Sequence, residues 1–124
     1  MPGKVFDASA VGAWCFREPR RDEAWDLMSG SELYAPLLLA YELANAARKK
    51  CIERPEDTIV TRAALRTALN LMWHWTDVDQ LEVLRLALET GLTTYDAAYL
   101  YLARWLGIPL VTFDERLARA AKTG

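Results

Sequence analysis

The sequence predicts an α/β sandwich in which helices cover a short, mainly parallel sheet of four or five strands. Short apolar segments of strand-like composition alternate with longer segments of helical periodicity, as expected for parallel strands joined by helices. The helical segments are also bounded by residues that favour helix ends. Since the 124 residues contain no repeat and no low-complexity linker, they predict one domain over residues 1–124.

Four segments are expected to form strands, because they are short, apolar and bounded by turn-forming or acidic residues. They are residues 4–6, 33–35, 73–78 and 110–113. Asp7 directly follows the first of these segments, and Asp114 directly follows the last. The predicted sheet therefore ends in a carboxylate at two places.

Helical periodicity and helix-end residues predict the intervening helices. They are residues 8–16, 19–28, 37–52, 57–72, 80–90, 94–106 and 115–122. Asp79 is a favourable N-cap for the helix over residues 80–90, and Thr93 or Thr94 is a favourable N-cap for the helix that ends at residue 106. Gly91 and Gly107 follow the same two helices, which is where glycine is most common at a helix end.

The balance of charge limits the possible functions. With 15 basic and 17 acidic residues the net charge is −2, which argues against binding nucleic acid through bulk positive charge. It does not exclude a nuclease, whose acidic site needs cations to approach phosphate. Basic residues gather in two groups that are expected to be solvated helix ends, namely Arg17, Arg20 and Arg21, and Arg48, Lys49, Lys50 and Arg54.

A cytoplasmic protein without membrane association is expected. No apolar segment reaches the roughly 18 residues needed to span a bilayer. No signal peptide is visible, because Asp7 follows Lys4 closely. Cys15 and Cys51 lie in apolar helical contexts and form no ligand cluster, so they are expected to be buried thiols in a reducing compartment.

Asp7 and Asp114 are the first candidates for a functional site. The carboxyl ends of parallel strands lie at the same edge of a sheet, where ligands of open α/β folds bind, so these two acids could share a cation. Each also immediately precedes a predicted helix, and Asp is a favoured helix N-cap. Capping explains either residue as well as function does, so neither is evidence by itself.

Asp96 and Glu42 lie in helical segments. Asp96 falls in the first turn of a helix that is apolar on most sides and therefore buried, so the acid is expected to face the interior or a cleft. A favourable contact with the helix dipole also explains it. Glu42 lies between Tyr41 and Leu43 in an uncharged stretch. Its neighbours are expected to be buried on both sides, so the acid needs a partner such as a metal ion; the alternative is a surface stripe with Asn45 and Lys49.

Clustered carboxylates repel one another unless a cation lies among them. Mg²⁺ and Mn²⁺ prefer oxygen ligands and leave coordination positions for a phosphate oxygen and an attacking water. Zinc is not expected, because the only histidine, His74, lies between two tryptophans and is expected to be a structural or surface residue. The acids that predict a Mg²⁺ or Mn²⁺ site are Asp7, Glu42, Asp96 and Asp114.

Four short motifs follow one another along the chain: Phe6-Asp7-Ala8-Ser9, Tyr41 to Asn45, Tyr95 to Tyr99, and Leu110 to Asp114. In order, spacing and total length they resemble the PIN-domain ribonucleases, and in particular the VapC-type toxins of prokaryotic toxin–antitoxin pairs. The resemblance spans nearly the whole sequence. It implies a three-layer α/β/α PIN-like domain, Mg²⁺- or Mn²⁺-dependent hydrolysis of RNA, homodimerisation and inhibition by a cognate antitoxin.

The resemblance also implies roles for single residues. Asp7 and Asp96 match the main metal ligands of the family. Glu42 and Asp114 match acids that bind the metal directly or through water, or orient the attacking water; the fourth acid varies within the family. Frequent polar neighbours of the site are matched by Ser9, Asn45 and Thr112.

Two helices, residues 20–28 and 37–52, are expected to offer a surface to a second copy of the chain or to the antitoxin. Trp14, Trp25 and Tyr34 could contribute, because aromatic residues are enriched at interfaces. Packing in the core explains these three residues equally well.

Other function classes remain open at this point. A catalytically silent PIN-like module could keep the fold only to bind a protein, although the presence of all four acids argues against it. A small phosphatase or phosphotransferase is the second alternative. A haloacid-dehalogenase-like enzyme would have an Asp two residues after the first one, where this chain has Ser9, and residues 8–10 lack the Gly-rich turn of a dinucleotide site.

Overall fold

A computed structural model describes residues 2–123 and contains one parallel sheet. The strands are β1 (Gly3–Phe6), β2 (Glu32–Ala35), β3 (Trp73–Trp75) and β4 (Leu110–Val111), in the order β3-β2-β1-β4. Every pairing is parallel, with Lys4 opposite Leu33 and Phe6 opposite Val111. The predicted sheet of four or five mainly parallel strands is therefore confirmed, with four strands.

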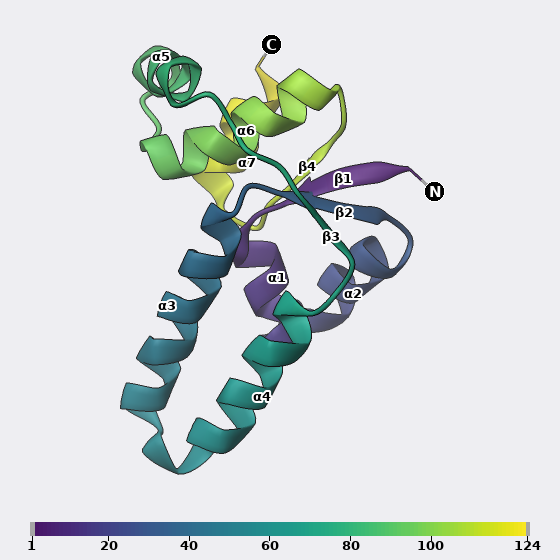
Figure 1. Ribbon diagram of the computed structural model, residues 1–124, viewed down its shortest axis with the longest axis vertical. Helices are drawn as coiled ribbons and strands as arrows, with labels where there is room; N and C mark the ends of the chain where they lie inside the picture. The colour runs from purple at the N-terminus through teal and green to yellow at the C-terminus, as the bar shows by residue number, and fades with distance from the viewer. Residues whose placement is uncertain (1, 124) are drawn as a thin grey trace.

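Helices cover both faces of this sheet (Figure 1). On one side lie α5 (Gln80–Thr90), α6 (Thr94–Leu106) and α7 (Glu115–Lys122). On the other side lie α1 (Ala8–Cys15), α2 (Arg21–Ser29), α3 (Leu38–Glu53), the 3₁₀ turn η1 (Pro55–Asp57) and α4 (Thr58–Leu69). Helices α3 and α4 pack against each other and extend away from the sheet as a hairpin. The three-layer α/β/α architecture is confirmed.

The core lies around β1 and α6. Val5 and Phe6 of the central strand are fully buried, and α6 packs against both β1 and β4. Most of α6 is buried, as its apolar sequence predicts; Tyr99 and Leu102 are among its most enclosed side chains. Burial of this helix fixes the position of its N-terminal turn, which begins at the carboxyl edge of the sheet.

The predicted helix ends are found at several positions. Four helices begin at a side chain that accepts a backbone N–H: Asp7, Asp79, Thr93 and Asp114. Two helices end at a glycine with positive φ, Gly91 at 77° and Gly107 at 69°. An L side chain rarely adopts this conformation, so glycine is the residue that lets the chain turn there.

Two predicted strands are shorter than expected. The segment predicted over residues 73–78 ends at Trp75, because its partner strand ends at Ala35 and Pro36 then leads into a helix. The segment predicted over residues 110–113 ends at Val111. Beyond it the Phe113 N–H donates to the Ser9 hydroxyl instead of to a neighbouring strand.

Two helices also have bounds that differ from the prediction. The helix expected over residues 57–72 is a 3₁₀ turn followed by α4, which ends at Leu69. Its end coincides with a hydrogen bond from the Trp73 indole to the carbonyl of Ala68, one of the carbonyls of the last turn. The helix expected from residue 19 begins at Arg21.

The cysteines are less enclosed than predicted. Cys15 and Cys51 are free thiols and are half-buried, not fully buried. Burial is still the main cause that raises the pKa of Cys15 to about 12, so this thiol stays protonated at neutral pH. Within residues 2–123, no helix is long and apolar enough to cross a membrane.

Candidate active site

Asp7 lies where β1 meets α1 and is almost completely enclosed, with 4% of its surface exposed. Three donors hold its carboxylate. The Ser9 hydroxyl and the Ala10 N–H donate to Oδ1 at 2.7 and 3.1 Å, and the Thr112 hydroxyl donates to Oδ2. Asp7 is therefore an N-cap, as predicted, and is also bonded to the chain beyond β4.

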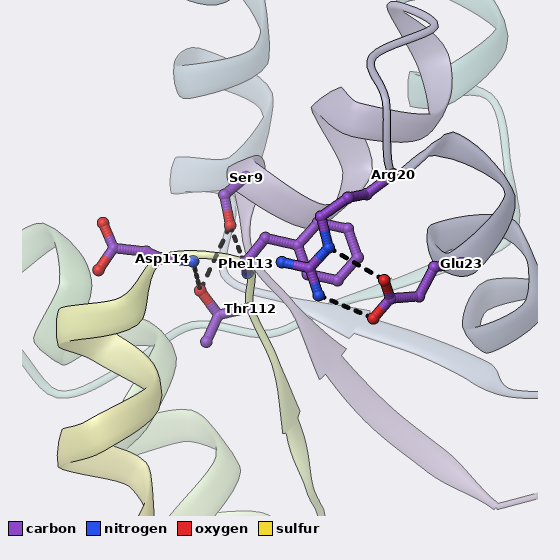
Figure 2. A network of polar contacts seen from close by, with 6 residues as sticks. All are labelled: Ser9, Arg20, Glu23, Thr112, Phe113 and Asp114. Carbon is purple, nitrogen blue, oxygen red and sulfur yellow. Dashed lines mark hydrogen bonds and ion pairs between the residues drawn. The ribbon is translucent and has the colours of Figure 1, made fainter.

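The loop of residues 112–114, between β4 and α7, is fastened to the start of α1. The Phe113 N–H donates to Ser9 Oγ at 2.8 Å, and the Asp114 N–H donates to Thr112 Oγ1 at 3.0 Å (Figure 2). The Asp114 carboxylate then accepts the N–H of Leu117 at 2.9 Å and caps α7. Side chains on both strand ends thus bring Asp7 and Asp114 to the same edge of the sheet.

The side chain of Phe113 packs under a guanidinium group. The carbon Cζ of Arg20 lies 3.8 Å from the centre of the Phe113 ring, and Arg20 forms two hydrogen bonds with Glu23, at 3.0 and 2.8 Å. Figure 2 shows this pair on the side of the loop away from Asp114. The N-terminal end of α2 is therefore joined to the loop that carries Asp114.

Glu42 projects from α3 and is half-buried. The phenol of Tyr99, itself 1% exposed, donates to Glu42 Oε1 at 2.6 Å. The neighbours of Glu42 differ from the expectation of burial on both sides, since Leu43 is fully buried but Tyr41 is 69% exposed. The glutamate thus lies at the boundary between the core and solvent, where it can meet a ligand.

Asp96 lies in the first turn of α6, next to the N-cap Thr93, whose hydroxyl accepts the Asp96 N–H at 3.1 Å. Its carboxylate is available to a ligand, because no hydrogen bond from any of residues 2–123 reaches it. Burial and the charge of Asp114 raise the pKa of Asp96, and the guanidinium of Arg116, which donates to the Gly91 carbonyl at 2.7 Å, opposes part of this rise.

Burial and the charges of neighbouring acids raise the pKa values of Asp7, Glu42 and Asp96. Burial is the largest cause that raises the pKa of Asp7 above its ordinary value, and the charge of Asp96 adds to it. Burial also raises the pKa of Glu42, again with contributions from Asp96 and Asp7. The pKa of Asp96 is raised by burial and then by the charge of Asp114. The four predicted acids therefore form one electrostatically coupled group.

The acids are grouped but do not form a closed cage. Among the described residues, no three Asp, Glu, His or Cys side chains converge tightly enough to enclose a metal ion. Ser9 and Thr112 contact Asp7 as members of the site, whereas Asn45 is exposed and its side chain makes no hydrogen bond to any residue in the range 2–123. Any ion here would need water to complete its coordination.

The structure adds four residues that the sequence did not single out for the site: Tyr99, Phe113, Arg20 and Arg116. Tyr99 could have been found, because it lies three residues after Asp96 and so on the same face of the helix. Arg20 and Arg116 could not, since their partners are distant in the sequence and no local pattern marks them.

Comparison with known proteins identifies the family of this chain. The model of the PIN domain family matches residues 4–123. Ribonuclease VapC3 from Pyrobaculum aerophilum is 34% identical over 119 residues, which cover 92% of this chain and 91% of the relative. Exonuclease VapC9 from the same organism is 38% identical over 85 residues, covering 68% of this chain and 64% of the relative.

A solved structure shows the same fold. The crystal structure of PAE2754 from Pyrobaculum aerophilum superposes with a TM-score of 0.80 at 29% identity, covering 98% of this chain and 86% of that one. The family match and this neighbour agree with the parallel sheet and the α/β/α layers described above. This chain belongs to the PIN-domain family and is VapC-like.

Proposed function

We propose that this chain is a Mg²⁺- or Mn²⁺-dependent endoribonuclease and the toxin of a VapBC-type toxin–antitoxin pair. The observation that carries the proposal is the coupled acidic edge formed by Asp7, Glu42, Asp96 and Asp114. It lies in a chain whose relatives are named as a ribonuclease and an exonuclease of the VapC group.

The donor set fits a hydrated divalent cation. Within residues 2–123, no Lys or Arg lies within ion-pair distance of Asp7 or Glu42, so their charge is left without a cationic partner. The three donors on Asp7 use three of its roughly four acceptor positions and leave one on Oδ2. Carboxylates supplemented by water are the usual environment of Mg²⁺.

Each acid has a separate task in this proposal. Asp7 and Asp96 would hold the ion, with Glu42 and Asp114 as direct or water-mediated ligands. When bound, the ion supplies a more acidic water and neutralises charge on the phosphate. The Tyr99 hydroxyl keeps one oxygen of Glu42 fixed, so the other can orient the attacking water or accept its proton.

The partner surface that we assign to the antitoxin is a groove of about 740 Å³ between α1, α2 and the α3–α4 hairpin. Trp14 and Trp25 stack in it with ring centres 5.1 Å apart, and Trp25 is exposed. Tyr34 lies elsewhere, stacked on the exposed His74. Aromatic side chains in a groove are suited to hold a peptide segment of a partner. We also propose that the toxin is a homodimer.

The activity is tested with the purified chain and a circular single-stranded RNA, which only an endonuclease can open. We expect cleavage with Mg²⁺ or Mn²⁺, none with EDTA, and none with Asp96→Asn. The matched control is Asp79→Asn, which changes the N-cap carboxylate of α5; within residues 2–123, Asp79 bonds only at its own helix start and is not among the charges that shift the pKa of Asp7, Glu42 or Asp96, and Asn still caps a helix.

The other candidates predict different results in the same assay. Cleavage of linear but not circular RNA would identify an exonuclease, and equal cleavage by Asp96→Asn would rule out the proposed site. A silent binding module would cleave neither RNA. Adding the protein encoded beside this chain tests the toxin assignment, since a cognate antitoxin should stop cleavage by the wild-type chain.

A further inference from the structure

A shallow hollow of about 480 Å³ lies between the end of α5, α6 and α7. Three arginines line it: Arg104 from α6, and Arg116 and Arg119 from α7. The one acid in its lining is Glu89. In a chain whose net charge is −2, this hollow carries a local excess of positive charge.

None of these arginines is neutralised by a carboxylate. Within residues 2–123, the ion pairs within 4.0 Å involve other cations, such as Arg20, Arg54 and Arg85. Arg116 donates one hydrogen bond to the Gly91 carbonyl, and Arg104 donates to the carbonyls at the end of α7. Each guanidinium has five N–H donors, so most of them remain free for a ligand.

The helix dipole does not explain this cluster. Arg104 and Arg119 lie in the last turns of their helices, where a positive charge is favourable. Arg116, however, lies at the start of α7, two residues after the N-cap Asp114, where the dipole disfavours a cation. Its hydrogen bond to the Gly91 carbonyl uses one of its five N–H donors, and the others are available to a ligand in the hollow that it lines with the other two arginines.

The hollow borders the acidic edge. Arg116 is anchored on Gly91, which leads through Thr93 into the turn that carries Asp96. Arg116 also lies two residues after Asp114 at the start of α7, so the hollow and the acidic edge share this turn of the helix. A strand bound at the acids would therefore continue into a region where guanidinium groups are unpaired and exposed.

We infer that this hollow binds a backbone phosphate of the RNA strand, next to the phosphate held at the acidic edge. The inference rests on the proposed ribonuclease function and deepens it by naming the residues that contact the strand. Guanidinium groups suit the ligand because their planar forks match phosphate oxygens. Such contacts position the strand without reading its sequence, so they predict affinity without base preference.

Arg119 is the best residue for the test, because its side chain forms no hydrogen bond with any of residues 2–123 and its loss should not disturb the fold. Arg116→Gln is the second variant. Arg62→Gln is the matched control, since Arg62 is an exposed arginine on α4 and lines neither this hollow nor the groove assigned to the antitoxin. Arg119→Lys keeps the positive charge but removes the planar set of N–H donors of the guanidinium.

Binding is measured without cleavage, by fluorescence anisotropy of a labelled single-stranded RNA with the Asp7→Asn chain in EDTA at several salt concentrations. We expect Arg119→Gln and Arg116→Gln to raise Kd about 5- to 10-fold. Each should reduce the slope of log K against log salt by about 0.7, the value for one phosphate contact on a single strand. Arg62→Gln should change neither quantity, and Arg119→Lys should retain the slope.

The inference is overturned if the Gln variants bind as tightly as the parent chain, if Arg62→Gln weakens binding equally, or if Kd rises with an unchanged slope. Failure of the proposed function looks different. If the wild-type chain does not cut RNA but Arg119→Gln still weakens binding with a reduced slope, the phosphate site stands and the nuclease assignment falls. If cleavage occurs and the Gln variants bind normally, only the phosphate site falls.

Discussion

The acidic edge has two halves that are held in different ways. In the strand half, Asp7 accepts three hydrogen bonds and Asp114 accepts the N–H of Leu117, so both carboxylates are fixed. In the helical half, Glu42 accepts one hydrogen bond, from Tyr99. The Asp96 carboxylate accepts none from residues 2–123.

The difference indicates how the site is assembled. The strand half is set by folding itself, because caps and hydroxyl contacts fasten the ends of β1 and β4 together. The helical half keeps open acceptor positions and unrelieved repulsion between acids. A bound cation would remove that repulsion, so we expect the helical half to respond to metal more strongly than the strand half.

The largest effect should come from Asp7→Asn, which tests whether the rigid half is also the essential one. Cleavage of RNA should fall by at least about 100-fold, because a charge that stabilises the reacting phosphate through the ion is lost. The helix start should survive, since Asn is also a good N-cap. The measurement is initial rate against metal concentration, and a rate within a few-fold of wild type would contradict the role of Asp7.

The same substitution should raise stability when metal is absent. Burial raises the pKa of Asp7 above its ordinary value of 3.8, so the folded state binds this proton more tightly than the unfolded state. The stabilising contribution is complete below pH 3.8 and is lost as pH rises through the raised pKa. At pH 7 in EDTA, Asp7→Asn should therefore melt above wild type, and Mg²⁺ should narrow or reverse the gap.

The next effect concerns the single hydrogen bond of the helical half. Tyr99→Phe keeps the buried ring and removes the hydroxyl that donates to Glu42. We expect metal affinity to fall about 10-fold, the lower end of the range for losing a group that orients a ligand. Tyr101→Phe is the matched control, because Tyr101 lies on the same helix and is half-buried. Calorimetric titration with Mn²⁺ measures the change, and equal losses in both variants would indicate a general packing effect.

The same contrast explains how much the sequence could predict. Asp7, Asp79 and Asp114 act within three residues of their own helix starts, so local spacing was sufficient to predict them as caps, and it narrowed the cap of α6 to Thr93 or Thr94, of which the structure has Thr93. The alternation of strands and helices likewise predicted the parallel sheet. These features depend on short-range geometry, which a single sequence contains.

Other features depend on contacts between distant segments. The hydrogen bond from Tyr99 to Glu42 spans 57 residues, and the contact of Arg20 with Phe113 joins the two ends of the chain. The fourth strand ended two residues earlier than predicted for the same reason, because Ser9 accepts the Phe113 N–H. A polar side chain that competes with the strand ladder leaves no periodic signal in the sequence.

The smallest effect should follow Thr112→Val, which tests whether the strand half is redundant. Valine has nearly the shape of threonine, so packing is kept while the donor to Asp7 Oδ2 is lost. The Asp114 N–H also loses its acceptor, but it is exposed and can bond to water. Asp7 retains the Ser9 and Ala10 donors, so we expect a loss of about 1 kcal/mol in stability and less than a 10-fold loss in metal affinity.

The control is Thr112→Ser, which keeps the hydroxyl and should behave as wild type in urea unfolding and Mn²⁺ titration. If Thr112→Val instead weakened Mn²⁺ binding more than Tyr99→Phe does, the strand half would not be redundant, and the contrast between the two halves would be reversed.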